Sequence, residues 1–320
     1  MKSPQELRFI STVKREGILP AGSCITAAVS GGADSICMLH MMMRFRKHMS
    51  WSLSVLHIDH SYRKSSGTDA EFVRSVATSL DLPFILRRFA SRIRKNSPEA
   101  DFSAARQAVY EEVAGDGLVA VAHTASDRAE TLLMRLLEGA GLRGLGGMDY
   151  FGVGPVRRPM LDLTAYEIRQ YLAGRNHAWV EDETNAAGTF LRNRIRHGIL
   201  EPLESEFPGV SRRIASSSAN LGSWRRVAEG LTLTALGQLS PPGCPEGLSR
   251  QSFQRYERAL RLSMLWEICG RPRGGAAELE KADSWIQTGG EGEKLLPGGT
   301  ILSAGRDLLV FTKSEGGRWR

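Results

Sequence analysis

The chain of 320 residues is long enough for two domains, each with its own apolar core. Hydrophobic residues make up 42% and charged residues 24%, which is typical of a soluble globular protein. No apolar stretch reaches the length of a membrane span and the opening Met-Lys-Ser-Pro-Gln-Glu has no apolar leader, so we expect a cytoplasmic protein with no membrane partner. The four cysteines form no C-x-x-C pair, which argues against a zinc ribbon, an iron–sulfur site or a disulfide framework.

The net charge of +7 favours a polyanionic partner. Residues 210–320 carry 16 Lys and Arg against 11 Asp and Glu, so most of the surplus lies in the last third of the chain. One basic pair is typical of a solvated surface, but six clusters together favour RNA or DNA. The clusters are Arg87-Arg88, Arg92/Arg94-Lys95, Arg157-Arg158, Arg212-Arg213, Arg225-Arg226 and Arg271/Arg273.

Residues 20–160 alternate between strand and helix patterns, which predicts an α/β fold with a parallel sheet wrapped by helices. Ligands of such sheets bind at the carboxyl ends of the strands. Polar residues follow three predicted strands there, namely Ser30, Asp59 with His60, and His123. The predicted strands are Ile25 to Val29, Leu53 to Ile58, Phe84 to Phe89 and Leu118 to Ala122, and the predicted helices are Asp34 to Lys47, Thr68 to Leu80, Glu99 to Ala114 and Asp127 to Glu138.

Pro208-Gly209 is the expected domain boundary, which gives a first domain over residues 1–208 and a smaller α+β domain over residues 209–320. Thr164 is expected to cap a helix, with Glu167 at the capping-box position. The other expected elements are a short strand near Phe151 to Val156, helices at Thr189 to Glu206, Val210 to Leu239, Ser252 to Cys269 and Ala276 to Thr288, and strands at Lys294 to Leu296 and Leu308 to Thr312.

The most informative segment is Ser30-Gly31-Gly32-Ala33-Asp34-Ser35, between the first predicted strand and the first helix. A Gly-rich turn at a helix start offers backbone N–H groups to a phosphate at the positive end of the helix dipole. The two serines can add hydroxyl donors, and Asp34 can hold the Mg²⁺ that accompanies a nucleotide. No G-x-x-x-x-G-K-[ST] sequence occurs, so the segment is not the Lys-containing P-loop. The hexapeptide resembles the PP-loop of the ATP pyrophosphatases.

Four further motifs follow in order: His57 to Arg63, Ala122 to Thr131, Gly139 to Leu145, and Phe190 to Arg196. With the hexapeptide they resemble the tRNA(Ile)-lysidine synthetase family over about residues 20–206. The resemblance implies ATP-dependent attachment of L-lysine to the wobble cytidine of tRNA(Ile) with a CAU anticodon, through an adenylated tRNA, with release of AMP and diphosphate. It also implies ATP as substrate and Mg²⁺ as cofactor, while the sequence leaves a homodimer open.

The same resemblance suggests roles for individual residues. Asp34 and Asp127 are expected to hold Mg²⁺, and Glu130 is the candidate group for holding and deprotonating the lysine amine. Arg192 and Arg196, four residues apart, share one helix face and can meet phosphate or adenylate, whereas Arg194 points elsewhere. The expected catalytic residues are Asp34, Asp127, Glu130 and Arg192; the ATP-binding residues are Ser30, Gly31, Gly32, Ala33, Asp34, Ser35, His57, Asp59, Arg106 and His123; and the tRNA-binding residues are Arg143, Arg194 and Arg196.

Several of these side chains have an alternative structural interpretation. Asp127 can stabilise a helix N-terminus, and His57 can be a buried hydrogen-bonded histidine. Arg106 can pair with Glu111, and Arg143 can lie on a plain surface.

The segment from His123 to Arg128 departs from the family pattern His-His-x-Asp-Asp-Gln, since one His, one Asp and the Gln are missing. The departure leaves Asp34 and Asp127 as the expected Mg²⁺ ligands. It also keeps open a nucleotide-dependent RNA-binding protein that has lost catalysis. A tRNA cytidine thiolase is the other alternative, although such enzymes need clustered active cysteines, which this sequence lacks.

Overall fold

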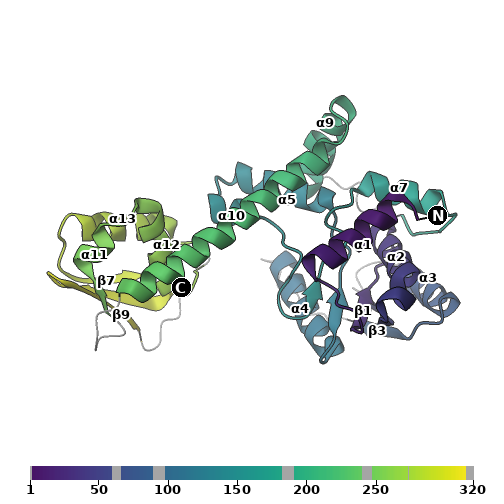
Figure 1. Cartoon of the computed structure of the whole chain (residues 1–320), viewed down its shortest axis with the longest axis horizontal. Coiled ribbons are helices and arrows are strands. Elements are labelled where there is room, and N and C mark those ends of the chain that lie inside the picture. The colour runs from purple at the N-terminus through teal and green to yellow at the C-terminus, as the bar shows by residue number, and fades with distance from the viewer. Residues whose placement is uncertain are drawn as a thin grey trace. The chain divides into compact units, whose positions relative to one another are not determined.

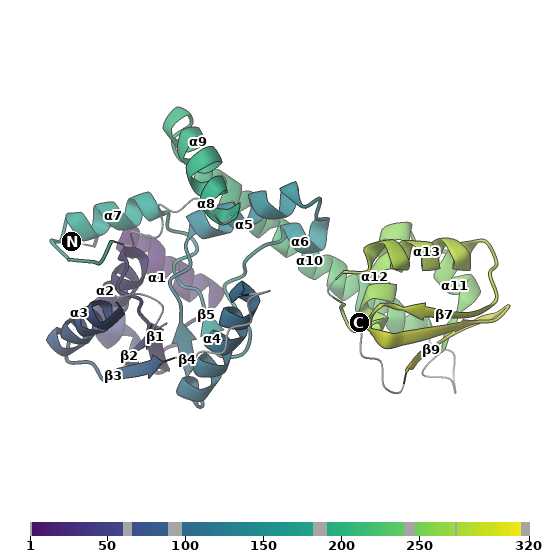
Figure 2. The same ribbon diagram turned by 180° about the vertical axis from the view of Figure 1, so that it is seen from behind.

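The computed structural model describes residues 2–59, 66–88, 98–181, 191–239, 247–272 and 274–314. The chain divides into two compact units, Met1–Gly222 and Ser223–Arg320, which are shown with their elements in Figures 1 and 2. The division falls inside the long helix α10 (Val210–Leu239), whereas the sequence suggested Pro208-Gly209. The first thirteen residues of this helix therefore belong to the first unit. Within the described residues, no helix is long and apolar enough to cross a membrane.

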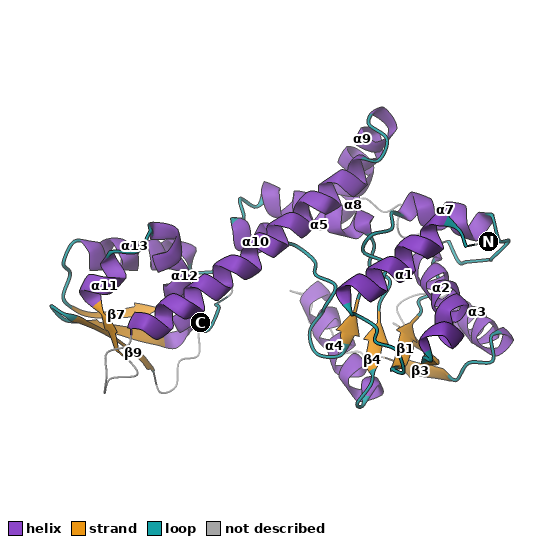
Figure 3. Cartoon of the chain, viewed as in Figure 1, coloured by secondary structure: helices purple, strands orange, loops and turns teal. Residues whose placement is uncertain are grey.

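The first unit is built on a five-stranded parallel sheet, which confirms the predicted fold class. Its strands lie in the order β3-β2-β1-β4-β5 (orange in Figure 3). The strands are β1 (Cys24–Ala28), β2 (Ser52–Asp59), β3 (Phe84–Arg88), β4 (Leu118–Ala120) and β5 (Val156–Arg157). The strand expected near Phe151 to Val156 is shifted toward the C-terminus, since β5 begins at Val156 and Phe151 forms only an isolated bridge with Arg157. The predicted end of β3 at Phe89 lies outside the described residues.

The helices cover both faces of this sheet. On one face α2 (Ala33–Met49) and α3 (Ser66–Ser79) join a core that includes Ile36, Met41 and Val73. On the other face α4 (Pro98–Ala114) packs Tyr110 and Ala114 against a small cluster of Val119, Val121 and Val156 at β4 and β5. β2 and β3 are added on one side of β1, and β4 and β5 on the other, so the connecting helices move to the opposite face of the sheet. Ligands of α/β sheets bind at this point of reversal.

Helix α1 (Pro4–Glu16) was not among the predicted elements. Ser3 caps its N-terminus in a capping box with Glu6, and Phe9, Ile10 and Val13 enter the main core beside α2 and α7 (Ala165–Ala173). Glu6 is fully buried, and its carboxylate accepts hydrogen bonds from Tyr171 (3.2 Å) and Arg175 (2.8 Å). These bonds satisfy a buried charge and tie α1 to α7.

The helix expected from Thr189 to Glu206 is divided in the structure, and residues 182–190 lie outside the described part. It consists of α8 (Leu191–Ile195), a π-helical turn η2 (Arg196–Leu200) and α9 (Glu201–Glu206). Pro202 has no N–H to donate to the carbonyl four residues earlier, and just before it the N–H of Glu201 bonds to the Arg196 carbonyl in a wider turn. Ile195 and Leu200 pack on Ala129 of α5 (Ala125–Leu137), which fixes this segment against α5.

The second unit combines part of α10 with an antiparallel sheet of order β6-β9-β8-β7, as expected for a small α+β domain. Its core includes Phe253, Met264, Leu265, Leu302 and Leu309. The helix expected at Ser252 to Cys269 is interrupted, and β8 was not predicted. The elements are β6 (Gly247–Ser249), α11 (Arg250–Gln254), α12 (Arg258–Ile268), α13 (Ala276–Gln287), β7 (Gly292–Leu296), the 3-10 turn η3 (Pro297–Gly299), β8 (Thr300–Ala304) and β9 (Leu308–Lys313).

Candidate functional site

The loop from Ser30 to Ser35 lies between the carboxyl end of β1 and the start of α2. Its conformation is held internally, because Ser35 Oγ donates to the Gly32 carbonyl (2.9 Å) and accepts from the Ser30 backbone N–H (3.2 Å). Gly32 is the N-cap of α2 and provides no side-chain cap. The first N–H groups of α2 therefore remain available for an anion at the positive end of the helix.

Gly31 is the residue that allows this loop to close. Its φ is 99°, in the region that favours glycine, and an added Cβ would contact Val73 (3.4 Å) and Val180 (3.5 Å). The Gly31 carbonyl also accepts a hydrogen bond from the Val180 backbone N–H (3.0 Å). Val180, which lies just before the undescribed residues 182–190, thus supports the loop through its backbone.

This loop opens into a cavity of about 600 Å³ in the first unit. The cavity lies at the strand reversal, where the chain leaves β1 and β4. Most of the predicted site residues line it. They are Ser30, Gly32, Ala33, Asp34, Ser35, Arg106, His123, Asp127, Glu130, Arg192 and Arg196.

Asp34 has an unusual carboxyl group at the first turn of α2. Burial raises its pKa to about 7, and the negative charges of Asp127 and Glu130 act in the same direction. Arg169 and Arg196 oppose this shift only in part. A buried carboxyl group whose ionisation is disfavoured by a neighbouring carboxylate is suited to binding a cation.

Asp127 has a second task in the fold. It lies at position N3 of α5, where its Oδ2 accepts hydrogen bonds from the Thr124 N–H (2.7 Å) and hydroxyl (2.8 Å) in a capping box. Its Oδ1 accepts a hydrogen bond from Arg192 Nη2 (2.7 Å). Its position matches the structural interpretation, and its role as a Mg²⁺ ligand stays a prediction.

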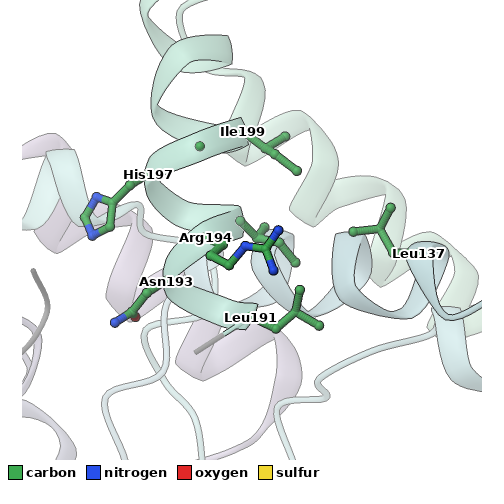
Figure 4. A pocket seen from close by; sticks show the side chains of 8 residues that line it. Leu137, Leu191, Asn193, Arg194, His197 and Ile199 are labelled. Carbon is green, nitrogen blue, oxygen red and sulfur yellow. The ribbon is translucent and has the colours of Figure 1, made fainter. Parts of the chain in front are cut away.

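Glu130 and two arginines form the most tightly bound cluster in the cavity. Glu130 is 1% exposed, and its two oxygens accept from Arg192 Nε (2.6 Å) and Arg196 Nε (2.6 Å). Arg192 and Arg196 thus share one face, as expected from their spacing, because one α-turn separates them. Arg194 lines a different pocket (Figure 4).

His123 follows β4 and lines the same cavity. Arg158 Nε donates a hydrogen bond to His123 Nδ1 (3.3 Å), so the neutral ring carries its proton on Nε2. Burial lowers the pKa of His123 to about 4, and the charge of Arg158 acts in the same direction, against that of Asp127. His123 is therefore a neutral side chain near pH 7.

The residues that depart from the family pattern have packing roles. Thr124 caps α5, and Ser126 Oγ accepts a hydrogen bond from the Ala165 N–H (3.1 Å). Arg128 is 2% exposed, donates to the Met148 carbonyl (3.0 Å) and stacks over the Tyr150 ring. Arg128 is not among the described residues that line the cavity.

Other predicted site residues lie outside the cavity lining. His57 is 4% exposed, and its Nδ1 bonds to the Val29 carbonyl (2.8 Å), which matches the structural interpretation. Asp59 is buried and accepts from Arg88 Nε (3.3 Å). Arg143 lies on the short helix α6 (Leu142–Leu145). The proposed roles of these residues in ATP or tRNA binding stay predictions, and His60 lies outside the described residues.

Three side chains or backbone groups were missed by sequence reasoning. Arg169 of α7 lines the cavity and partly opposes the rise in the pKa of Asp34, Arg158 fixes the ring of His123, and Val180 supports Gly31. Arg158 had been noted only as part of a basic pair. Arg169 carries no local signal, since it lies within an ordinary amphipathic helix.

The carboxylates of the cavity can provide only part of the coordination shell of a divalent cation. Among the described residues, no group of three or more His, Cys, Asp or Glu is arranged to hold a metal ion. Asp34 and Asp127 supply two carboxylates, a number that suits Mg²⁺ completed by phosphate oxygens and water.

Comparison with known proteins identifies the family. The model of the PP-loop domain matches residues 5–203. A tRNA(Ile)-lysidine synthase from Solibacter usitatus is 36% identical over 231 residues, which are 71% of this chain and 51% of that protein. The chain thus spans about half the length of this relative. One from Synechococcus sp. is 33% identical over 267 residues, 81% of each chain.

A solved structure supports the fold alone. The U34-tRNA thiolase NcsA from Methanococcus maripaludis has a TM-score of 0.58 at 14% identity and covers 68% of this chain and 78% of its own. The five-stranded sheet, the loop at Ser30 to Ser35 and the sequence matches agree. The chain belongs to the tRNA(Ile)-lysidine synthase family of PP-loop proteins.

Proposed function

We propose that this protein attaches L-lysine to carbon-2 of the wobble cytidine of tRNA(Ile) with a CAU anticodon, which would change its identity from methionine to isoleucine. The observation that carries the proposal is one cavity that joins an uncapped helix N-terminus to a cluster of two carboxylates and two arginines. The first half suits a nucleotide and the second an amine with its activated acceptor. A reaction on tRNA belongs in the cytoplasm.

The first step would be adenylation of the cytidine. The carbonyl oxygen at carbon-2 attacks the α-phosphate of ATP, an oxygen–phosphorus bond forms, and diphosphate leaves. The N–H groups at the start of α2 would bind the departing diphosphate, and Arg196 would stabilise negative charge on the phosphoryl group. Bound Mg²⁺, held by Asp34 and Asp127, would neutralise phosphate charge.

The second step would be attack of the lysine amine on carbon-2, with release of AMP. The ammonium group must first lose a proton, and Glu130 is the proposed group that holds it and accepts that proton. In the structure both oxygens of Glu130 accept from Arg192 and Arg196. One of the two arginines must therefore turn toward the adenylate before lysine reaches Glu130. This movement would couple the binding of lysine to completion of the first step.

Basic side chains outside the cavity would hold the tRNA. We assign this role to Arg143 and Arg194, to Arg196 at the cavity wall, and to residues 209–320, most of which form the second unit. The electrostatic term of RNA binding scales with the number of phosphates neutralised.

The two alternative functions receive less support. A thiolase needs reactive thiols, yet Cys37 is fully buried with a raised pKa, and Cys24 begins β1 at the end away from the loop. A catalytically impaired RNA-binding protein was suggested by the changed segment from His123 to Arg128. Its substitutions serve capping and packing and leave Asp34, Asp127 and Glu130 in the cavity.

The test is a reaction with purified protein, ATP labelled in its α-phosphate, lysine and unmodified tRNA. The expected products are AMP, diphosphate and tRNA whose wobble nucleoside has gained the mass of lysine with loss of water. AMP formation without lysine on the tRNA would favour another PP-loop chemistry. RNA binding without AMP formation would favour the impaired protein.

A further inference from the structure

A second cavity lies on the other side of the segment that carries Arg192 and Arg196. It has a volume of about 780 Å³ and is lined by Leu137 from the end of α5 and by seven residues of α8 and η2. Figure 4 shows Leu191 and Ile199 directed toward Leu137, with the Arg194 guanidinium between them. The seven residues are Leu191, Asn193, Arg194, Ile195, His197, Gly198 and Ile199.

Three apolar side chains at this cavity are exposed. Leu137 is 65% exposed, Leu191 42% and Ile199 37%. Isolated exposed apolar side chains are common, but two leucines and an isoleucine around one hollow favour a binding site. The π-helical turn at Arg196–Leu200 is the rare backbone form that often accompanies functional sites.

The charge of the lining selects the class of ligand. Of the described residues that line the cavity, Arg194 is the only arginine or lysine, and none is acidic. No carboxylate within the described ranges pairs with the exposed Arg194 guanidinium. A ligand with an apolar planar body and an anionic attachment fits this lining, because a guanidinium can stack on a base or bind a phosphate.

The position of the cavity narrows the ligand further. Arg192 and Arg196 line the first cavity, which is the proposed nucleotide cavity. Arg194 lines the second cavity, and His197 lines both. The two cavities therefore lie on opposite sides of one helix, which is about 10 Å across with its side chains. Two nucleotides close in sequence in one RNA strand can reach both.

We propose that this second cavity, between Leu137 and the segment Leu191 to Ile199, binds an unpaired nucleobase of the RNA substrate close to the target cytidine. The inference rests on the proposed RNA substrate and deepens it by naming a separate base-binding site. The base would lie against Leu137, Leu191 and Ile199, and Arg194 would contact its face or its phosphate. Occupation would hold the strand in the register that presents the cytidine to the first cavity.

Gly198 offers a direct way to block the cavity. It lines the cavity, its φ is ordinary, and an added Cβ would meet nothing within 4 Å. Gly198→Leu should therefore fold and fill the hollow, and Gly198→Ala is the matched control that adds a single methyl group. ATP affinity of both variants should equal that of the unchanged protein, because Gly198 does not line the nucleotide cavity.

The experiment measures the affinity of synthetic anticodon stem-loops for the three proteins by fluorescence anisotropy. One RNA is intact, and the others each lack one base in the loop next to the target cytidine. We expect the unchanged protein to lose affinity roughly tenfold for one of these abasic RNAs. Gly198→Leu should bind the intact RNA with a similar loss, and the two losses should not add, because both empty the same contact. Gly198→Ala should stay within about twofold of the unchanged protein.

Three results would overturn the proposal. The first is an unchanged affinity of Gly198→Leu for the intact RNA. The second is that the loss of affinity caused by Gly198→Leu adds fully to the loss caused by every abasic RNA. The third is a change in the sedimentation of Gly198→Leu without RNA, which would make a second copy of the chain the occupant of the cavity. Lysine transfer by the unchanged protein is measured in parallel. Its absence would remove the proposed reaction while the affinity data still decide the base-binding site.

Discussion

Arg192 and Glu130 are 62 residues apart in the chain, yet Arg192 Nε donates a 2.6 Å hydrogen bond to Glu130 Oε2. The contact exists because Ile195 and Leu200 pack on Ala129, which brings α8 against α5. Arg196 Nε occupies the other oxygen of the same carboxylate at 2.6 Å. The acidic group expected to receive lysine is thus held between two cations before any substrate binds.

Glu130→Gln should slow lysine transfer by about 10² or more and leave adenylation close to normal, because the amide keeps the shape and cannot accept a proton. The amide NH₂ would also face one guanidinium donor, so the melting temperature should fall modestly. Single-turnover assays of the two steps would measure both effects. Glu112→Gln, which removes an exposed surface ion pair with Arg87, is the control and should change neither step. Slow adenylation with normal transfer would reassign Glu130 to the nucleotide.

Asp34→Asn and Asp127→Asn should have similar effects on chemistry and opposite effects on stability. Both should slow adenylation by about 10² or more, since each removes a proposed Mg²⁺ ligand. Asp34→Asn removes a buried carboxyl group whose pKa is raised to about 7, so at pH 8 without ligand the protein should become more stable. Asp127→Asn weakens the cap of α5 and the pair with Arg192, which should cost about 1 kcal/mol or more.

Thermal melts with and without ATP and Mg²⁺ would separate these cases. Stabilisation by Mg²⁺ with ATP should shrink in both variants relative to the unchanged protein. If Asp127→Asn forms adenylated tRNA at the normal rate, its carboxylate is structural only. If Asp34→Asn does so, the assignment of the metal to this cavity is wrong.

The main sheet was predictable because its signals are local. Apolar runs such as Ile25 to Val29 end in polar or glycine residues, and each run is followed by a helical pattern. The capping-box sequence at Ser3 and Glu6 also indicates a helix start and could have predicted α1. The π-helical turn at Arg196–Leu200 could not be predicted from the sequence. It depends on a tertiary contact, because Pro202 interrupts the hydrogen bonds of a helix that is packed on α5.

The site was predictable only within each motif. The shared face of Asp127 and Glu130 follows from their spacing, and so does that of Arg192 and Arg196. That the two faces meet is a tertiary contact with no local signal. Arg158 and Arg169 were missed for the same reason, because an arginine beside a cavity has the same sequence appearance as one on the surface.

Acidification should destabilise the protein through a stacked pair of histidines. The rings of His40 and His177 lie 3.6 Å apart, and burial lowers the pKa of His40 to about 4, with a further contribution from His177. The pKa of His177 is lowered by burial and by Arg175. A histidine with a lowered folded pKa favours the unfolded state once protons bind, so stability should fall as the pH decreases from about 6.5 to about 4.

Urea unfolding across this pH range would measure the loss of stability that His40 contributes. His40→Gln should flatten the pH dependence, although it will also lose stacking at pH 8. His48→Gln is the control, because His48 is exposed and bonds to Lys14 at the surface. An unchanged slope in His40→Gln would show that other groups cause the acid sensitivity.

Two truncations should distinguish folding of the first unit from tRNA binding by the second. Removal of everything after Phe207 deletes Arg212, which pairs with Glu167, and Ile214, which packs beside Ile195 and Leu200. This variant should lose stability by a few kcal/mol even without RNA. Removal of everything after Gly222 keeps these contacts and should retain ATP affinity within about twofold, since every described residue lining the cavity precedes this point.

The Gly222 truncation should nevertheless bind tRNA more weakly. Residues 223–320 carry 14 Lys and Arg against 11 Asp and Glu, because Arg212 and Arg213 belong to the first unit. The surplus is small, so the loss of affinity should come from clustered basic residues, and the slope of affinity against salt concentration should decrease. Filter binding of unmodified tRNA over a range of salt concentrations measures both. Equal affinity and equal slope for the truncated and complete chains would assign all tRNA phosphate contacts to residues 1–222.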